Sequence, residues 1–268
     1  MQSKEQTDQY QFNDAKHLHS LNGRPLTGTS SVVNVLAKGG LTWWASGMAC
    51  AEFGWLNPKK HTEDELIESA RNARVDLVDM DAKDYVKHLQ KAYYAHSTNL
   101  KKTAKKGTDL HAELEDFVKG VMGIMPKREY DERIKPFVEW SKENVEEFLW
   151  SEAHCYDESL WVGGISDTGV KLKTGKLAVI DFKSSKEAYL NQFIQDAGYA
   201  LQIEKNGLWN STGTMNKRID GKFEELIVVP FGAKVVTPVV RCNVEELKQG
   251  FVSAVSLYRL VSKEKTNY

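Results

Sequence analysis

The sequence predicts an α/β or α+β fold in which helices flank a central mixed β-sheet. Three observations lead to this prediction. Apolar residues at helical spacing, preceded by capping signals, dominate the first half of the chain. A stretch with strand and turn signals follows at residues 163–183. A long helical pattern, two alternating segments and a final amphipathic helix then complete the chain.

The composition allows one large domain, or one domain with a helical extension. The chain has 268 residues, of which 41% are hydrophobic and 27% are charged, enough for a sizeable core. No low-complexity tract marks a linker, and the sequence contains no internal repeat. We therefore expect a mostly helical extension over residues 1–100, a possible wall of a DNA channel, and a core over residues 101–268, together forming one compact unit.

Local signals define the elements of the N-terminal part. The dipeptide Asn22-Gly23 predicts a hairpin turn between short extended segments. Thr62 with Glu65 three residues later has the spacing of a capping box and predicts the start of a helix. The expected elements are, in order, extended pieces over 17–36 that end in a helix from Ser30, a helix over Trp43 to Met48, helices after Thr62 and after Asp81, and a helix over about 101–120.

The middle and the C-terminal part combine strands with helices. A turn at Thr174-Gly175 predicts a hairpin, and the apolar run 177–180 is typical of a strand buried on both faces. Pro230 and Pro238 predict strands that lie at an edge or finish early. The expected elements are a helix over about 130–149, an extended run through Gly163-Gly164, strands at 170–173 and 177–183, a helix over about 187–205, strands at 225–231 and 235–241, and a helix introduced by Asn243 and Glu246.

The sequence also limits the compartment and the kind of site. The first residues lack the apolar segment of a signal peptide, and no stretch approaches 18 consecutive apolar residues. We therefore expect a soluble, cytoplasmic protein without a membrane partner. Cys50, Cys155 and Cys242 are far apart and form no Cys-x-x-Cys pair, which argues against a disulfide framework and a cysteine-rich metal site.

The charge of the whole chain does not indicate nucleic-acid binding, because the formal net charge is only −1. A local basic cluster is the best candidate for contacts to phosphates, and a solvated helix face is the alternative interpretation. The cluster consists of Lys101, Lys102, Lys105 and Lys106.

Two carboxylates and a lysine are expected to meet at the end of the central hairpin. Asp181 and Lys183 are two residues apart on a strand, so they point to the same face, and the hairpin brings Asp167 towards Asp181. Converging carboxylates repel each other without a cation, and their oxygens suit Mg²⁺ or Mn²⁺. Such an ion activates water and a phosphate, while Lys183 offsets developing charge. A surface salt bridge is the alternative.

Two helical pairs with i, i+4 spacing extend this candidate site. His111 and Glu115 share one helix face, where an imidazole can bind metal and a carboxylate can bind or orient it. Gln195 and Tyr199 share another face and suit contacts to a phosphate or to water. The alternatives are a packed or exposed histidine, and a core tyrosine beside an incidental glutamine.

Taken together, these residues resemble the PD-(D/E)xK nuclease superfamily, in the RecB-like branch that includes phage exonucleases and the mitochondrial genome maintenance exonuclease. The resemblance covers about residues 101–205. The matching motifs are, in order, Gly107-Thr108-x-x-His111-x-x-x-Glu115, Gly163-Gly164-x-x-Asp167, Ile180-Asp181-Phe182-Lys183-Ser184-Ser185 and Gln195-x-x-x-Tyr199.

The resemblance implies a restriction-endonuclease-like core and a role for each motif. Asp167, Asp181 and His111 would bind the divalent metal together with the Phe182 carbonyl, and Glu115 would be a further ligand. Lys183 would be the catalytic lysine. The remaining expected DNA contacts are Gln195 and Tyr199 near the cleaved bond, then Ser184, Ser185 and the basic cluster.

The chain departs from the superfamily pattern in two places. The residues before the first acid are Ile165-Ser166, without the usual proline, and the second acid is Asp181 rather than a glutamate. Both variants are common in the RecB-like branch. Iron–sulfur relatives in this branch need four cysteines, so we expect no iron–sulfur cluster in this protein.

We therefore expect a Mg²⁺- or Mn²⁺-dependent DNA exonuclease of phage type that serves recombination, replication or end processing and acts on DNA with a free end. The alternatives are a structure- or site-specific endonuclease, a non-catalytic nucleic-acid-binding module, and an enzyme for small phosphate esters. The spacing does not choose an oligomeric state. Core packing is favoured over base stacking for Trp43, Trp44, Tyr93 and Tyr94.

Overall fold

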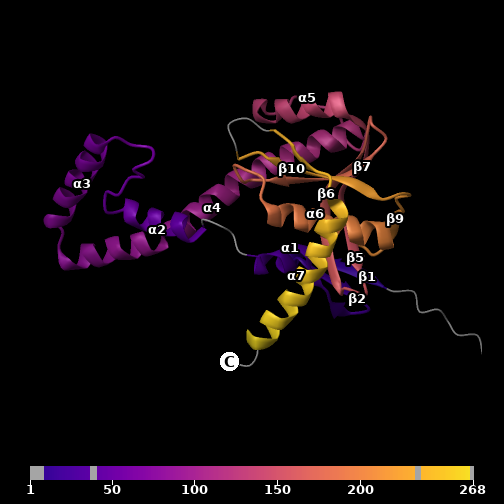
Figure 1. The fold of residues 1–268 in the computed structure, drawn as a ribbon, viewed down its shortest axis with the longest axis horizontal. Coiled ribbons are helices and arrows are strands. Elements are labelled where there is room, and N and C mark those ends of the chain that lie inside the picture. Colours follow the sequence, from indigo (N-terminus) through magenta and orange to yellow (C-terminus); the bar gives the residue numbers. More distant parts are fainter. Residues whose placement is uncertain (1–8, 37–40, 233–236, 266–268) are drawn as a thin grey trace, which may run out of the picture. The chain divides into compact units, whose positions relative to one another are not determined.

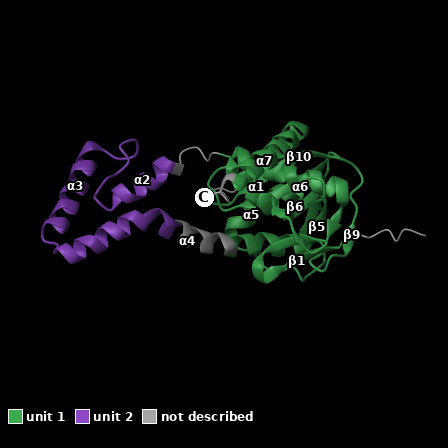
Figure 2. Ribbon diagram, turned by 90° about the horizontal axis from the view of Figure 1, so that it is seen from below, with its two compact units in different colours: residues 1–37, 107–268 green, residues 38–106 purple. Residues whose placement is uncertain are grey.

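The computed structural model describes residues 9–36, 41–232 and 237–265, and at positions 41, 100–108, 264 and 265 it describes the backbone alone. The chain forms two compact units, shown in Figure 2. Unit 1 comprises Met1–Ala37 and Gly107–Tyr268, and unit 2 comprises Lys38–Lys106. The division differs from the one expected at residue 100, because the N-terminal strands belong with the C-terminal part.

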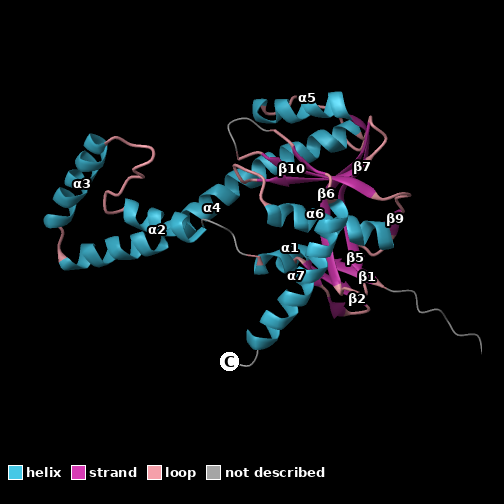
Figure 3. Ribbon diagram, viewed as in Figure 1, coloured by secondary structure: helices cyan, strands magenta, loops and turns pink. Residues whose placement is uncertain are grey.

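Unit 1 is built on a mostly antiparallel sheet of eight strands, coloured in Figure 3. The strand order is β11-β10-β7-β6-β5-β8-β9, and β4 pairs with β6. Only the β7–β10 and β4–β6 pairs are parallel among the described strands of this sheet. The strands are β4 (Thr27–Gly28), β5 (Val145–Asp157), β6 (Val162–Leu172), β7 (Leu177–Lys183), β8 (Leu208–Trp209), β9 (Met215–Lys217), β10 (Phe223–Pro230) and β11 (Val239–Arg241).

A smaller sheet of three antiparallel strands precedes it: β1 (Tyr10–Asn13), β2 (Leu18–Leu21) and β3 (Arg24–Pro25). The turn between β2 and β3 is at Asn22-Gly23, as the sequence predicts, and both residues have the positive φ that this dipeptide favours. Short 3₁₀ helices lie at η1 (Asp14–Lys16), η2 (Val33–Val35) and η3 (Glu132–Ile134).

Helices cover both faces of the large sheet (Figure 1). The helices of the described residues are α1 (Thr29–Val32), α2 (Leu41–Ala51), α3 (Glu63–Val78), α4 (Ala82–Val121), α5 (Lys135–Asn144), α6 (Leu190–Asn206) and α7 (Val244–Lys265), and α2, α3 and the first part of α4 belong to unit 2 rather than to these layers. One core lies between the sheet and α6 and α7, and it includes Val179 and Phe251. A second core lies between the sheet, the end of α4 and α5, and it includes Leu114 and Phe137. The expected α/β class, with helices flanking a central sheet, is therefore confirmed.

Strand β7 is buried on both faces, as its apolar run predicts. Val179 belongs to the core under α6, whereas Ile180 and Phe182 belong to the core under α4 and α5. Because side chains alternate along a strand, Asp181 and Lys183 lie on the α6 side. The strand therefore delivers both polar side chains to one face at its C-terminal end.

The helix predicted over about residues 130–149 is wrong over residues 145–149, which form a strand. Helix α5 ends at Asn144, and Val145 and Phe148 belong to the long strand β5. Phe148 pairs with Val170 of β6 and is buried in the core under α4 and α5. Pairing with β6 along almost the whole of β5 outweighs the local helical pattern.

Three other elements differ from expectation. The two helices expected after Asp81 and over 101–120 form the single helix α4 of 40 residues. The runs expected at 163–164 and 170–173 are one strand, β6. The expectation from the two prolines agrees with the structure, because β10 ends at Pro230 and β11, which follows Pro238, is the edge strand. The expected strand 235–241 begins at Val239, and residues 233–236 lie outside the described part.

Unit 2 contains α2, α3 and the first part of α4. Its predicted capping box is present: Thr62 N donates to Glu65 Oε2 at 2.8 Å, and Glu65 N donates to Thr62 Oγ1 at 3.4 Å. Helix α3 has no buried residue. Core packing is wrong for four aromatic residues of this unit, because their exposed fractions are 83% for Trp43, 37% for Trp44, 71% for Tyr93 and 56% for Tyr94.

Within the described residues, the structure contains no helix of the length and apolar character needed to cross a membrane.

Candidate active site

The β6–β7 hairpin brings Asp167 to the strand that carries Asp181. The two strands are antiparallel with Thr168 opposite Ile180, so Asp167 and Asp181 follow at the same end of this ladder. Asp167 Oδ2 accepts a hydrogen bond of 2.7 Å from the backbone N–H of Phe182. A residue 15 positions away in the sequence is thereby held beside the end of β7.

Asp181 and Lys183 form an ion pair at this end of the sheet. Lys183 Nζ lies 2.5 Å from Asp181 Oδ2, and the Asp181 side chain is only 2% exposed. The contact lacks the angles of a hydrogen bond, so Asp181 Oδ2 has no hydrogen-bond donor among the described residues. A buried carboxylate oxygen with a single ionic contact can accept a further cation or donor.

His111 reaches the same cluster from α4. Its Nε2 lies 3.2 Å from Asp167 Oδ2, and since a carboxylate only accepts, Nε2 is the donor. The imidazole also packs in T-shaped arrangements against the rings of Phe182 and Phe231. Burial alone would lower the pKa of His111, but the hydrogen bond with Asp167 and the negative charges of Asp167, Asp181 and Glu152 together outweigh it, so the pKa is raised.

The two carboxylates have opposite electrostatic environments. Burial raises the pKa of Asp181 to about 7, and the negative charge of Asp167 contributes, while Lys183 opposes the shift. Burial also acts on Asp167, but His111, Lys183 and the Phe182 N–H favour its charged form, so the pKa of Asp167 is lowered. The shared site therefore holds one carboxylate that ionises readily, Asp167, and one, Asp181, for which burial outweighs the compensating charge of Lys183.

Gln195 and Tyr199 form a hydrogen-bonded pair on α6. Gln195 Nε2 donates to Tyr199 Oη at 2.8 Å, and both side chains are buried. The Tyr199 ring packs on β6 at Gly164, where an added Cβ would lie 2.7 Å from Tyr199 Cε1. Burial first, and then the negative charge of Asp181, raise the pKa of Tyr199. The pair therefore lies beside the carboxylates, and its two side chains hydrogen-bond to each other.

Glu115 is not brought into the Asp167–Asp181 cluster. Its carboxylate forms an ion pair with Lys119 one turn along α4. Partial burial and a hydrogen bond with Glu115 raise the pKa of Glu152, on β5, to about 7. Glu152 has a φ of 48°, which is uncommon for a residue other than glycine. The expected ligand Glu115 therefore belongs to a neighbouring acidic pair.

The structure describes only some of the side chains that are expected to contact DNA. Ser185 Oγ donates to Glu187 O at 2.7 Å and accepts from Gln192 Nε2 at 3.1 Å, so it stabilises the turn before α6. Ser184 is exposed next to it. The side chains of Lys101, Lys102, Lys105 and Lys106 lie outside the described part of the structure. The role expected for the Phe182 carbonyl stays a prediction.

Sequence reasoning missed two acidic residues near this site. Asp196 is fully buried on α6, between Gln195 and Tyr199, and an acidic residue beside the apolar Phe193, Ala197 and Ala200 was the available signal. Glu152 had no such signal. Its proximity to Glu115 depends on strand β5, and the start of this strand was predicted as part of a helix. Both residues add a carboxyl group to this end of unit 1, and that of Asp196 is buried whereas that of Glu152 is exposed.

The donor set fits a hard divalent cation in its chemistry. Two carboxylates and an imidazole are suitable ligands, and no side chain or backbone group that the structure describes donates a hydrogen bond to the buried Asp181 Oδ2. The ligands are not spaced for an ion as they stand, since no group of three or more His, Cys, Asp or Glu side chains in the described residues is arranged to hold one. Lys183 and His111 occupy the oxygens of the two carboxylates instead.

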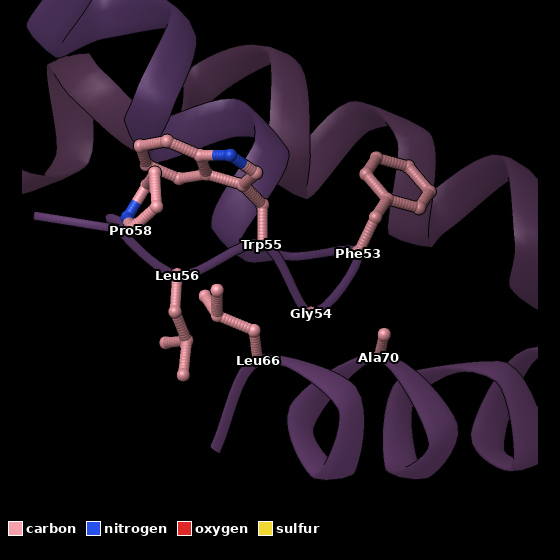
Figure 4. Close-up of a pocket in the computed structure, with 7 residues that line it drawn as sticks. All are labelled: Phe53, Gly54, Trp55, Leu56, Pro58, Leu66 and Ala70. Carbon is pink, nitrogen blue, oxygen red and sulfur yellow. The ribbon is translucent and has the colours of Figure 1, made fainter. Parts of the chain in front are cut away.

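One described pocket lies within unit 2. It has a volume of about 370 Å³ and is lined by the loop after α2 and by α3. Figure 4 shows loop residues such as Trp55 and Leu56 on one side, with Leu66 and Ala70 of α3 on the other. The lining is apolar and includes none of the predicted site residues, so this pocket supplies no group to the proposed cation site.

No protein-family model matches the chain, and no curated protein matches it.

Proposed function

We propose that this protein is a divalent-cation-dependent DNA nuclease of the PD-(D/E)xK type, and that it acts as an exonuclease on DNA with a free end. The observation that supports this most is the convergence of Asp167, Asp181, Lys183 and His111 at the end of the β6–β7 hairpin. These four residues come from three elements, α4, β6 and β7, and are up to 72 positions apart in the sequence (183 − 111). Their order along the chain is the one that the resemblance implies.

The proposed chemistry divides the work among these side chains. Asp167, Asp181 and His111 would hold Mg²⁺ or Mn²⁺, which when bound supplies positive charge to a phosphate oxygen and activates water. Lys183 offsets the negative charge that develops on the phosphate in the transition state. Its ammonium is well suited to this role: burial alone would lower the pKa of Lys183, but the nearby carboxylates, first Asp181 and then Asp167, outweigh burial, raise the pKa and keep the side chain protonated.

Features outside the carboxylate cluster support DNA as the substrate. Gln195 and Tyr199 would exchange their mutual hydrogen bond for contacts to the phosphate next to the cleaved bond. The exposed aromatic rings of unit 2, among them Trp43 and Tyr93, offer surfaces on which unpaired bases can stack. A restriction-endonuclease-like core, a phage-type origin and a role in recombination, replication or end processing are part of the same proposal.

The test is cleavage of labelled DNA by purified protein with Mg²⁺, Mn²⁺ or a chelator. We expect Asp181→Asn and Lys183→Ala each to lower the rate by at least about 100-fold, since each removes charge that acts on the transition state. The matched control is Lys171→Ala, because Lys171 lies on the same hairpin but pairs with Glu146 at the surface. Cleavage by Asp181→Asn at the wild-type rate would falsify the assignment.

The substrate form separates exonuclease from endonuclease activity. An exonuclease degrades linear DNA and spares closed circles, whereas an endonuclease opens the circles. Labels at the 5′ or the 3′ end then give the polarity of digestion from the order in which products appear. Opening of closed circles at the rate of linear DNA would replace the exonuclease assignment with the endonuclease one.

A further inference from the structure

A buried carboxyl group that has no hydrogen-bond partner in the described part of the chain lies next to the proposed active site. Asp196, on α6, has an exposed fraction of 0%. Neither of its oxygens has a hydrogen-bond partner among the described residues. Buried polar side chains are nearly always hydrogen-bonded, so one that is not calls for an explanation.

The position of Asp196 on α6 directs it towards the carboxylate cluster. Helix α6 covers the face of β7 that carries Asp181 and Lys183, and Tyr199, three residues after Asp196, packs on Gly164 of β6. Residues three apart lie on the same side of a helix. The charged groups close enough to act on Asp196 are Asp181, Lys183 and Asp167, and Asp196 in turn acts on Lys183.

Lys183 has only one ion-pair partner among the described residues, Asp181, and the proposed function requires this same carboxylate to bind the divalent cation. Its Nζ lies 2.5 Å from Asp181 Oδ2, the buried oxygen that the proposed function assigns to the divalent cation. Two cations on one carboxylate oxygen repel each other. When the divalent ion binds, the lysine therefore needs a second anionic group within reach of its flexible side chain.

We propose that Asp196 is a positioning residue that receives the Lys183 ammonium when Asp181 binds the divalent cation. This inference rests on the proposed function. Without the cation Lys183 pairs with Asp181, and with it Lys183 pairs with Asp196 and stays beside the reacting phosphate. The exchange explains why a carboxyl group is kept in a buried position where it has no other partner among the described residues.

The test is a double-mutant cycle on cation affinity, measured with Mn²⁺ by titration calorimetry on the full chain without DNA. In Asp196→Asn, Lys183 has no alternative partner and competes with Mn²⁺ for Asp181, so we expect affinity to fall at least about tenfold. In Lys183→Met this competition is absent, and adding Asp196→Asn should then change nothing, because the two effects are coupled.

The possible results separate this inference from the function on which it rests. Wild-type affinity in Asp196→Asn, or an equal loss with and without Lys183, would overturn the role of Asp196 while leaving the proposed function intact. Absence of Mn²⁺ binding by the wild-type chain would overturn the proposed function itself. If Asp196→Asn does not fold, crystals of the wild-type protein with and without Mn²⁺ decide: Lys183 Nζ should move from Asp181 to Asp196, and an unmoved lysine contradicts the proposal.

Discussion

In the candidate site, a single carboxylate oxygen, Asp167 Oδ2, has hydrogen-bond partners on two other elements. Asp167 Oδ2 accepts both the Phe182 N–H at 2.7 Å and His111 Nε2 at 3.2 Å. A carboxylate oxygen has two lone pairs and accommodates both donors. This oxygen joins β6, β7 and α4 at one point, and Asp167 Oδ1 takes part in neither contact.

His111 is the residue whose role is most directly testable at this scale. We expect His111→Gln to raise the Mg²⁺ concentration needed for half-maximal cleavage by about tenfold, because loss of a ligand or of its orienting partner weakens a metal site by this order. DNA binding in the presence of a chelator should change little. The measurement is cleavage rate as a function of Mg²⁺ concentration.

The matched control is His88→Gln, since the described hydrogen bond of the His88 ring is to the backbone oxygen of Glu52, within unit 2. An unchanged Mg²⁺ titration for His111→Gln would remove this histidine from the site.

At the scale of elements, the close contact of α6 with β6 requires a glycine, which has no side chain, at position 164. A Cβ at Gly164 would lie 2.7 Å from Tyr199 Cε1 and 2.8 Å from Thr29 Oγ1, closer than side chains approach each other. We expect Gly164→Ala to lower the free energy of unfolding by about 1–3 kcal/mol, the usual effect of overpacking. It should also slow cleavage, because Tyr199 must move.

Gly250→Ala is the control for that prediction. Gly250 lies on α7, where a Cβ would be 3.7 Å from Ile194, an ordinary contact. This substitution should leave cleavage unchanged and stabilise the helix by about 0.5–1 kcal/mol. Chemical denaturation measures both variants, and equal stability of the two would show that the close approach of Tyr199 to Gly164 is not needed.

The contact of the small sheet with β5 should be sensitive to acid. Tyr10 Oη lies 2.6 Å from His19 Nδ1 and 3.0 Å from His154 Nδ1, in a buried aromatic cluster. Burial first, then His154 and His17, lower the pKa of His19 from 6.5 to about 3. The folded protein therefore keeps His19 neutral under conditions in which the unfolded chain binds a proton.

The direction of the pH dependence follows from this difference. The stability that neutral His19 contributes is present above the unfolded pKa of 6.5 and is lost as the pH falls below it towards 3. We expect this residue to contribute a slope of about 1.4 kcal/mol per pH unit over that range. Urea unfolding at several pH values should show a shallower dependence for His19→Phe than for wild type. The exposed His61→Gln should match wild type, and equal slopes for all three proteins would contradict the prediction.

At the scale of the whole molecule, the two units differ in how much they bury. The three hydrophobic clusters of the described residues lie entirely in unit 1. In unit 2 the buried hydrophobic residues among those described are Ala92 and Ala95. Large apolar side chains of this unit are exposed, Val78 at 72% for example. Unit 2 should therefore open far more easily than unit 1.

Hydrogen exchange measures this difference. We expect amides of α3 to exchange at least about a thousandfold faster than those of β7, because opening of α3 exposes almost no apolar surface whereas β7 opens only with the core. Adding DNA should slow exchange in unit 2 if its exposed aromatic rings bind bases. Exchange of α3 as slow as that of β7 in the free protein would show that unit 2 is stabilised by contacts of its own.

The sequence by itself determined the features that depend on near neighbours. The alternation of β7, the turn at Asn22-Gly23, the capping box at Thr62 and the pairing of Gln195 with Tyr199 all follow from spacings of one to four residues. The backbone geometry of a strand, a turn or a helix fixes such relations wherever the element lies in the molecule. The hairpin that carries Asp167 to Asp181 is local in the same sense.

Only the tertiary structure decided what depends on distant partners. Phe148 is in a strand because β6 pairs with it, and the proximity of Glu152 to Glu115 follows from that strand. Asp196 matters because α6 lies over β7, and Trp43 is exposed because no element of unit 2 covers it among the described residues. Strand pairing and burial add contributions from segments far apart in the chain, and local spacing contains no information on those contacts.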